Sequence, residues 1–416
     1  MIIRKLSLNN LIWFIFVFYL FTIIAFGDRA DYFKYSNITF IVLIGFMALY
    51  VIKQSLVVPR ALFMFLPFLI YSFLSTAWSY IPNYTIQRSV TILRLFVLLV
   101  IMSFYLLKSK QTEQFIYGFA LAGIIIIIYL FSFYGFLGLR KMINEGSRVG
   151  EGFVNSNTLA IYLSFSSIIF LYLFLHKKKW YYIVLALGLV AIIASTGSKK
   201  GLLDLAVGYG LVFGFNQEQT KGMKKIVKWI IALSIVVIAL YLLWNSPVFS
   251  TVRIRFERMI GFLSGAGEVI DYSTKERQLM ISIGWKQFLE TPIFGIGIGA
   301  SGYLTSIALG TNTYLHNDYI ELLATGGLFG LVLQYFPIIY IYTKNWKYRK
   351  ISKASQLSSV LLTIYIVNSI AAVQYFSKLS YVIFAIGLAC YLENRNTEQT
   401  NNMHKFIQHK DHAFFW

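Results

Sequence analysis

The chain has 416 residues, of which 58% are hydrophobic and 13% are charged, and its mean hydropathy is +0.67. A soluble domain of this length has too little interior to cover so much apolar surface, so the composition excludes a soluble protein and predicts an all-α polytopic membrane protein. The net charge of +20 would indicate a nucleic-acid partner in a soluble protein. In a membrane protein that charge is assigned loop by loop, and no nucleic acid is expected.

Apolar segments long enough to cross the hydrocarbon core recur along the chain, since about 20 helical residues span about 30 Å. The sequence predicts about twelve transmembrane helices, at 8–26, 36–52, 61–78, 90–107, 115–137, 158–175, 180–195, 201–215, 226–244, 318–343, 355–375 and 379–392. The first segment follows a basic start but no small-residue cleavage site comes after it. We therefore expect it to remain as a membrane anchor.

Lys and Arg residues are retained preferentially in cytoplasmic loops, which orients the chain. With the N-terminus and the C-terminus in the cytoplasm, the outward-facing basic residues are concentrated at 138–157, 195–201 and 245–315. Positive charge on the side where the rule disfavours it suggests that this side binds an anionic ligand. The alternative is that single side chains reach lipid headgroups, and membrane lipids are partners in either case.

The predicted spans divide the chain into four parts. Residues 1–244 hold helices one to nine, 245–315 form a large extracytoplasmic loop, 316–392 hold helices ten to twelve, and 393–416 form a cytoplasmic tail. The loop is much longer than an ordinary connection and should carry function. The tail is polar and is expected to be disordered, although its three histidines leave a metal site open.

Within the long loop, the sequence Ser273-Thr274-Lys275-Glu276 is a capping box, and apolar residues follow at helical spacing over 277–289. This pattern predicts an amphipathic helix on the membrane surface or over a cavity. Thr291-Pro292 ends it, and glycines at 295, 297, 299 and 302 allow a close approach of the backbone. The stretch 253–258 fits either a second amphipathic helix or an extended arm.

No phosphate-binding loop or dinucleotide motif is present, so nucleotide-driven chemistry has no support. The single cysteine, Cys390, lies in the last apolar segment and is expected to be a small core residue. The sequence therefore predicts neither a cofactor nor a structural metal site.

The turn at 195–201 has a composition that suits an anion. It reads Ser-Thr-Gly-Ser-Lys-Lys-Gly, so Ser198, Lys199 and Lys200 stand beside the N-terminus of the next predicted helix. Arg94 and Asp204 lie in or at the edge of spans, where a charge is costly unless it is paired or faces water. Each is a candidate for an ion pair or for a functional site.

A second polar element, Gly150 to Thr158, precedes another span on the same side. Asn155 and Asn157 are candidates for acceptor binding, with Arg148 just upstream; the alternative is that both asparagines only cap a helix.

The strongest chemical candidate is His316, the only histidine on the outward side. An imidazole with a pKa near 6.5 accepts a proton from a hydroxyl close to neutral pH. Asn317, Asp318 and Glu321 follow at the start of the next predicted helix and are candidates to orient the imidazole or to bind an acceptor. A histidine that only caps a helix is the alternative.

These elements together resemble the O-antigen ligase and O-antigen polymerase superfamily of bacterial glycan assembly. The matching pieces are Gly-Phe-x-Asn-x-Asn at 152–157, Thr-Gly-Ser-basic-x-Gly at 196–201, the helix that carries Arg277, Pro-x-x-Gly-x-Gly at 292–297, and His316-Asn317 followed by two glycines. One departure matters, because the family usually has Arg after Thr-Gly-Ser and here two lysines follow. Lysine keeps the charge but lacks the planar fork of arginine.

The resemblance implies a transmembrane glycosyltransferase in the inner membrane whose site faces the periplasm or cell exterior. Its donor is an undecaprenyl-pyrophosphate-linked oligosaccharide, held by Lys199, with Lys200 beside it, and Arg277. His316 is implied to be the base, and the reaction is expected to be inverting and metal-independent.

The resemblance leaves the acceptor open. A polymerase transfers the glycan to the next lipid-linked repeat in O-antigen, capsule or exopolysaccharide assembly, whereas a ligase transfers it to the lipid A core or to a protein. We favour the polymerase slightly because the composition rich in Ile, Lys and Tyr suits capsule-forming bacteria with AT-rich genomes. Other polysaccharide-assembly proteins are possible partners. A flippase for lipid-linked oligosaccharides is the alternative from another class, but the chain lacks the repeat symmetry expected of transporters.

Overall fold

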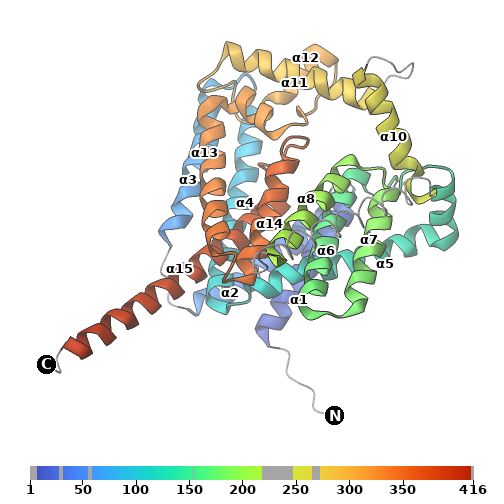
Figure 1. Ribbon diagram of the computed structural model, residues 1–416. Coiled ribbons are helices and arrows are strands. Elements are labelled where there is room, and N and C mark those ends of the chain that lie inside the picture. Colours follow the sequence, from blue (N-terminus) through green and yellow to red (C-terminus); the bar gives the residue numbers. More distant parts are fainter. Residues whose placement is uncertain are drawn as a thin grey trace.

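The computed structural model describes residues 7–27, 31–54, 59–152, 154–217, 247–264 and 272–413. Every regular element in these ranges is a helix (Figure 1). The helices are α1 (Leu8–Phe26), α2 (Phe33–Ile52), η1 (Arg60–Phe65), α3 (Leu66–Leu74), η2 (Ser75–Trp78), α4 (Pro82–Ser109), α5 (Thr112–Asn144), α6 (Ser156–Lys177), α7 (Trp180–Ser195), α8 (Lys199–Asn216), α10 (Pro247–Ser264), α11 (Tyr272–Glu290), α12 (Ser301–Leu309), α13 (Asp318–Tyr348), α14 (Lys353–Asn368) and α15 (Lys378–Ala413).

The predicted spans coincide with helices in the described residues, except that the last part of the span 355–375 is not helical; the segment 226–244 lies outside the described residues. Within the described part, seven helical stretches are long and apolar enough to cross a membrane, which makes the chain a multi-pass membrane protein. These stretches are Leu8–Phe26, Phe33–Ile52, Arg60–Trp78, Pro82–Ser109, Thr112–Asn144, Ser156–Lys177 and Asp318–Tyr348. Helix α7 is apolar but shorter.

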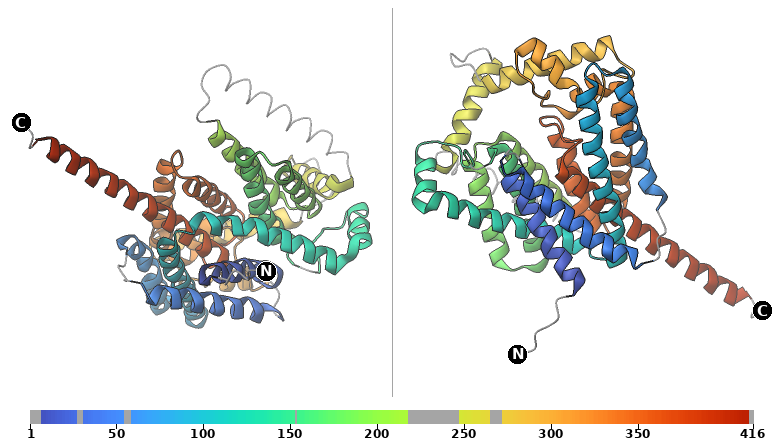
Figure 2. Two further views of the ribbon diagram at one scale, coloured as in Figure 1. Left: turned by 90° about the horizontal axis from the view of Figure 1, so that it is seen from below. Right: turned by 180° about the vertical axis from the view of Figure 1, so that it is seen from behind.

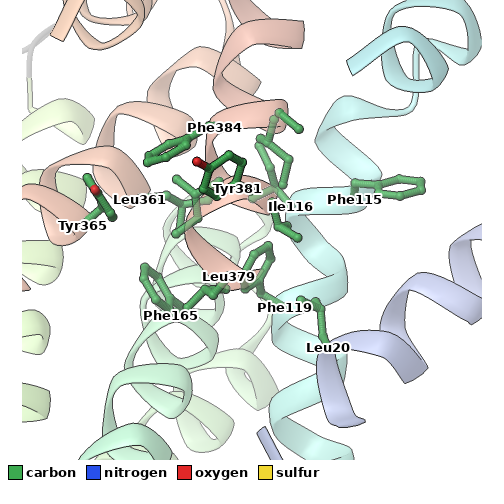
Figure 3. Close-up of a cluster of buried hydrophobic side chains, with 14 of the residues drawn as sticks. Leu20, Phe115, Ile116, Phe119, Phe165, Leu361, Tyr365, Leu379, Tyr381 and Phe384 are labelled. Carbon is green, nitrogen blue, oxygen red and sulfur yellow. The ribbon is translucent and has the colours of Figure 1, made fainter. Parts of the chain in front are cut away.

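A large aromatic and aliphatic core holds the bundle together (Figure 3). Phe119 of α5 and Phe165 of α6 lie in one buried cluster with Tyr365 of α14 and Phe384 of α15, whereas Phe115 of α5 points away from Tyr365 and Phe384. The rings of Phe119 and Phe165 lie 5.9 Å apart, and those of Tyr365 and Phe384 lie 4.9 Å apart in an edge-to-face arrangement. Cys390 is fully buried, as expected for a core residue.

The segment between α8 and α13 forms helices at one end of the bundle. Figure 1 shows α11 and α12 lying across the end of the bundle that is opposite to the end of α15. The amphipathic helix predicted at 277–289 is α11, and the stretch 253–258 is part of helix α10 rather than an extended arm.

The glycine run after α11 packs against a kink in α13. Gly297 donates its N–H to the Thr325 carbonyl, and Leu328 donates to the Pro292 carbonyl. The kink is at Gly327, where φ is +62°, and a Cβ atom there would lie 2.2 Å from the Ile293 carbonyl oxygen. Only glycine permits this approach, which anchors the outer helices to the membrane bundle.

Two elements depart from the sequence-based predictions. Helix α14 ends at Asn368, seven residues before the predicted boundary, and a non-helical turn occupies 369–377. Helix α15 continues to Ala413, which corrects the prediction of a disordered tail from 393 (Figure 2). No proline or glycine interrupts 388–413, so nothing in that stretch breaks the helix.

Candidate active site

A cavity of about 920 Å³ lies beneath the outer helices and collects side chains from distant parts of the chain. Its charged lining residues are Arg88, Arg94, Lys200, Arg277 and Lys378, and His316 also faces it. The described lining includes no Asp or Glu. Apolar side chains of α1, α2 and α6 complete the wall. A pocket that combines cations with an apolar surface suits an anionic lipid.

His316 is held in the cavity wall by its neighbours. Its φ is +55°, a left-handed conformation that is uncommon for residues other than glycine and persists only when surrounding contacts impose it. The preceding residue, Leu315, is fully buried, and its N–H donates to Glu321 Oε2 at 2.9 Å. The ring of Tyr314 lies 4.5 Å from the imidazole, edge to face. These contacts aim the imidazole into the cavity.

The surroundings of His316 disfavour its protonated form. Burial, followed by the positive charges of Arg277 and Lys200, lowers the pKa of His316 to about 4. The imidazole is therefore neutral at physiological pH and has a nitrogen lone pair available to accept a proton.

Asp318 and Glu321 are fully engaged elsewhere, which argues against direct contact with the imidazole. Asp318 accepts from the Tyr335 hydroxyl and from the N–H groups of Gln374 and Tyr375. Glu321 accepts from the Ser301 hydroxyl and the N–H of Leu315. Both are buried, so these carboxylates anchor loops that line the cavity and are positioning residues.

The asparagines have capping roles in the structure. Asn317 caps α13 by accepting from the Ile320 N–H, and its amide donates to the Ile370 carbonyl. Asn155 caps α6 by accepting from the N–H groups of residues 157 and 158. Asn155 and Asn157 still line the cavity, so a cap and a contact with a ligand are compatible.

Arg148 links two segments next to the cavity. Its guanidinium donates to the Thr196 carbonyl and to Asn157 Oδ1, which ties the segment before α6 to the turn before α8. Burial, and next the charge of Arg255, lowers the pKa of Arg148 to about 10. Arg148 is not part of the cavity lining, so the structure gives it a bracing role.

The turn at 195–201 presents one of its two lysines to the cavity. Ser198 caps α8 by accepting from the Gly201 N–H. Lys200 lines the cavity and donates to the Ala371 carbonyl, whereas Lys199 is not among the lining residues. Asp204 is buried and accepts from the Asn368 amide at 2.9 Å and from the Ser164 hydroxyl at 3.4 Å. Two neutral groups thus hold the carboxylate by hydrogen bonds, and Lys200 is within electrostatic reach of it.

Comparison with known families places this geometry in context. Residues 184–335 match the family model described as O-antigen ligase. This match covers less than half of the chain. The match confirms the resemblance to the O-antigen ligase and polymerase superfamily and implies membrane glycan transfer. No curated protein sequence matches the chain.

The matched segment 184–335 supplies Lys200, Arg277 and His316 to the cavity, while Arg94 and Lys378 come from outside it. Arg88 and Lys378 were not among the candidates predicted from the sequence. Arg88 lies in the first turns of α4, which begins at Pro82, eight residues before the predicted boundary, and its guanidinium lies 3.4 Å from the centre of the Phe376 ring. The available signal was that both are basic residues on the outward side.

In the described residues, no cluster of three or more His, Cys, Asp or Glu side chains could hold a metal ion. The side chains of the tail histidines lie outside the described set. A smaller recess of about 160 Å³ adjoins the cavity and shares Arg88 and Tyr314 with it.

Proposed function

We propose that this protein is an inverting, metal-independent glycosyltransferase that acts on the extracytoplasmic face of the bacterial inner membrane. Its donor is an undecaprenyl-pyrophosphate-linked glycan, and its acceptor is a hydroxyl group of another glycan. The observation that carries the proposal is the meeting of His316, Arg277 and Lys200 at one cavity that contains cations and apolar surface but no carboxylate among its described lining residues.

The donor fits the cavity by charge and by polarity. Its diphosphate carries two negative charges, which Arg277 and Lys200 offset through charge-assisted hydrogen bonds. The apolar wall accommodates the first part of the lipid tail. Two cations near the leaving group stabilise the charge that develops on the diphosphate as the glycosidic bond breaks.

The reaction is a single displacement. The acceptor oxygen attacks the anomeric carbon, the bond between that carbon and the diphosphate oxygen breaks, and the lipid diphosphate leaves with the electron pair. The hydroxyl proton passes to the neutral imidazole of His316. A bound diphosphate offsets Arg277 and Lys200, so it raises the pKa of His316 and makes the imidazole a better base.

Two acceptors suit this chemistry, since a polymerase and a ligase use the same donor. We favour the polymerase, and the alternative is a ligase that transfers the glycan to the lipid A core or a protein. A flippase is the more distant alternative, and it would need no base in the cavity.

Glycan transfer by purified protein in nanodiscs tests the proposal. The assay supplies lipid-diphosphate-linked repeat units without metal or nucleotide, and it compares wild type with His316→Ala. Because a positioned general base contributes about 10²- to 10⁴-fold, we expect a rate loss of that size. The control is His176→Ala, since His176 stacks on Tyr172 away from the cavity lining. Equal transfer by wild type and His316→Ala would contradict the proposed base.

A further inference from the structure

We propose that Arg94 and Lys378 form a second diphosphate-binding site in the same cavity, which holds the acceptor by its own lipid carrier. The inference rests on the proposed function and specifies its acceptor as a lipid-linked diphosphate. It therefore favours a polymerase over a ligase.

The cavity is lined by more positive charge than one donor diphosphate can neutralise. A lipid-diphosphate-linked glycan carries two negative charges, whereas the cavity is lined by five cations. Lys200 is within electrostatic reach of Asp204 and Arg88 of Glu321, but no carboxylate among the described residues forms an ion pair with Arg94, Arg277 or Lys378. Partly buried cations without counter-ions are costly, so a single diphosphate leaves a surplus of charge that a second anion would offset.

The cations that line the cavity form two groups. Lys200 and Arg277 are within electrostatic reach of each other and of His316, whereas Lys378 interacts with Arg94. Lys378 begins α15 and Arg94 lies in α4, so this pair belongs to a different part of the wall. Two like charges within electrostatic reach repel, and an anion that contacts both would relieve the repulsion.

The Lys378 ammonium group is held in a defined position at the cavity wall. It donates to Ser36 Oγ and to Asn37 Oδ1, both at 2.8 Å, and it lies 4.5 Å from the centre of the Phe33 ring. These contacts fix the position of the ammonium group, so its positive charge is held at the cavity wall, where it can attract an anion. Asn37 also lines the cavity and offers amide donors.

Apolar side chains of α2 provide a surface for a lipid tail beside Lys378. Phe33, Phe40 and Ile41 line the cavity beside Lys378. Ile41 is 67% exposed and Phe33 is 44% exposed, so the wall continues onto an outer apolar face of the bundle. A lipid chain can lie on this face while its diphosphate contacts Arg94 and Lys378.

The position of the pair relative to the matched segment fits a role in acceptor choice. Lys200, Arg277 and His316, to which the proposed function assigns the donor chemistry, lie in the matched segment 184–335. Arg94 and Lys378 lie outside it. A site that distinguishes one acceptor from another is expected outside the matched segment.

Binding stoichiometry tests the second site without knowledge of the sugar repeat. The probe is a C15 prenyl diphosphate, counted by native mass spectrometry on the full-length protein in detergent. We expect two molecules on wild type, one on Arg94→Gln/Lys378→Gln, and one on Lys200→Gln/Arg277→Gln. The matched control is Lys34→Gln, which removes an exposed cation of α2 that does not line the cavity and should leave two molecules bound.

The outcomes separate the two proposals. One molecule on wild type that is lost in Lys200→Gln/Arg277→Gln overturns the second site and leaves the donor site in place. No binding to wild type overturns both. Two molecules on Arg94→Gln/Lys378→Gln also overturn the second site, and recovery of the second molecule by Lys378→Arg with Arg94 intact, after its loss in Lys378→Gln, supports a requirement for charge.

A phosphate could also come from a structural phospholipid, and a transfer assay distinguishes this source. Donor labelled in its glycan is held constant while a short-chain lipid-diphosphate repeat unit is titrated as acceptor. We expect Lys378→Gln to raise the acceptor KM by about tenfold or more, because charged hydrogen bonds contribute on that scale, with little change in donor binding. An unchanged acceptor KM together with loss of co-purified phosphatidylglycerol would assign the site to a phospholipid and overturn the proposal.

Discussion

The acidic and the basic residues at the outward end of the bundle have opposite roles. Asp318 and Glu321 begin α13, and all four carboxylate oxygens accept hydrogen bonds from the protein itself. Arg94, Arg277 and Lys378 face the cavity, and no carboxylate among the described residues pairs with them. The two acids therefore anchor the segments around the cavity, whereas these three cations can contact a ligand in it.

This difference has a physical origin. A buried carboxylate is tolerable when several N–H and O–H groups donate to it, and the turn at 369–377 and the loop before α13 supply these donors. Cations that face a wide cavity retain free donors. Substitutions in the two groups should accordingly affect different properties, namely catalysis and donor binding for the bases and stability for the acids.

The largest effect is expected for Arg277. We expect Arg277→Gln to lower kcat/KM for the donor by about 10²- to 10³-fold, because it removes a charge that stabilises the leaving diphosphate. Arg277→Lys should lose less, since the charge remains without the fork. Initial transfer rates over a range of donor concentrations measure both. The control is Lys286→Gln, an exposed cation of the same helix, and an equal loss there would contradict a local role for Arg277.

The two lysines of the 195–201 turn should differ. Lys200 lines the cavity and Lys199 does not. We expect Lys200→Gln to reduce donor kcat/KM by about 10- to 100-fold, as for loss of one charged hydrogen bond, and Lys199→Gln to change it by less than about threefold. The same donor titration measures both variants. If Lys199→Gln were the more damaging, the assignment of the donor contact would be reversed.

For the acids, Glu321→Gln should act on stability. The new amide would place a donor against the Leu315 N–H or the Ser301 hydroxyl, and leaving such a buried group unsatisfied costs about 1–3 kcal/mol. Thermal unfolding in detergent measures the effect, with Glu290→Gln, an exposed residue at the end of α11, as the control. An unchanged melting temperature would mean that Glu321 does not anchor the loop.

The smallest effect concerns pH. Because the pKa of free His316 is about 4, kcat/KM should stay constant from pH 7 down to about pH 5 and fall only near pH 4. Removal of the Lys200 charge favours the protonated imidazole, so Lys200→Gln should shift this acidic limb to higher pH. Donor binding acts in the same direction, so the acidic limb of kcat should lie above that of kcat/KM. Coincident limbs would argue against His316 as the titrating base.

Sequence patterns predicted much of the fold because hydrophobic length and sidedness are local properties. Seven of the predicted spans have the length and apolarity to cross a membrane, and the amphipathic helix at 277–289 is α11. The prediction of a disordered tail was wrong because it rested on polarity alone, although the residues of the tail permit a helix. The end of α14 was not predicted because no Gly or Pro marks it. The turn that follows is stabilised by Asp318, which accepts hydrogen bonds from two backbone N–H groups of that turn.

The sequence by itself determined the membrane class and the resemblance to a family of glycan transferases, and it proposed His316, Lys200 and Arg277 as candidates, because residue types and their spacing along the chain carry that information. Only the tertiary structure decided which charges share a cavity. It added Arg88 and Lys378, directed Lys200 rather than Lys199 to the cavity, and turned Asp318 and Glu321 into anchors. The physical reason is that neutralisation of a buried charge depends on partners from distant helices, which spacing along the chain does not specify.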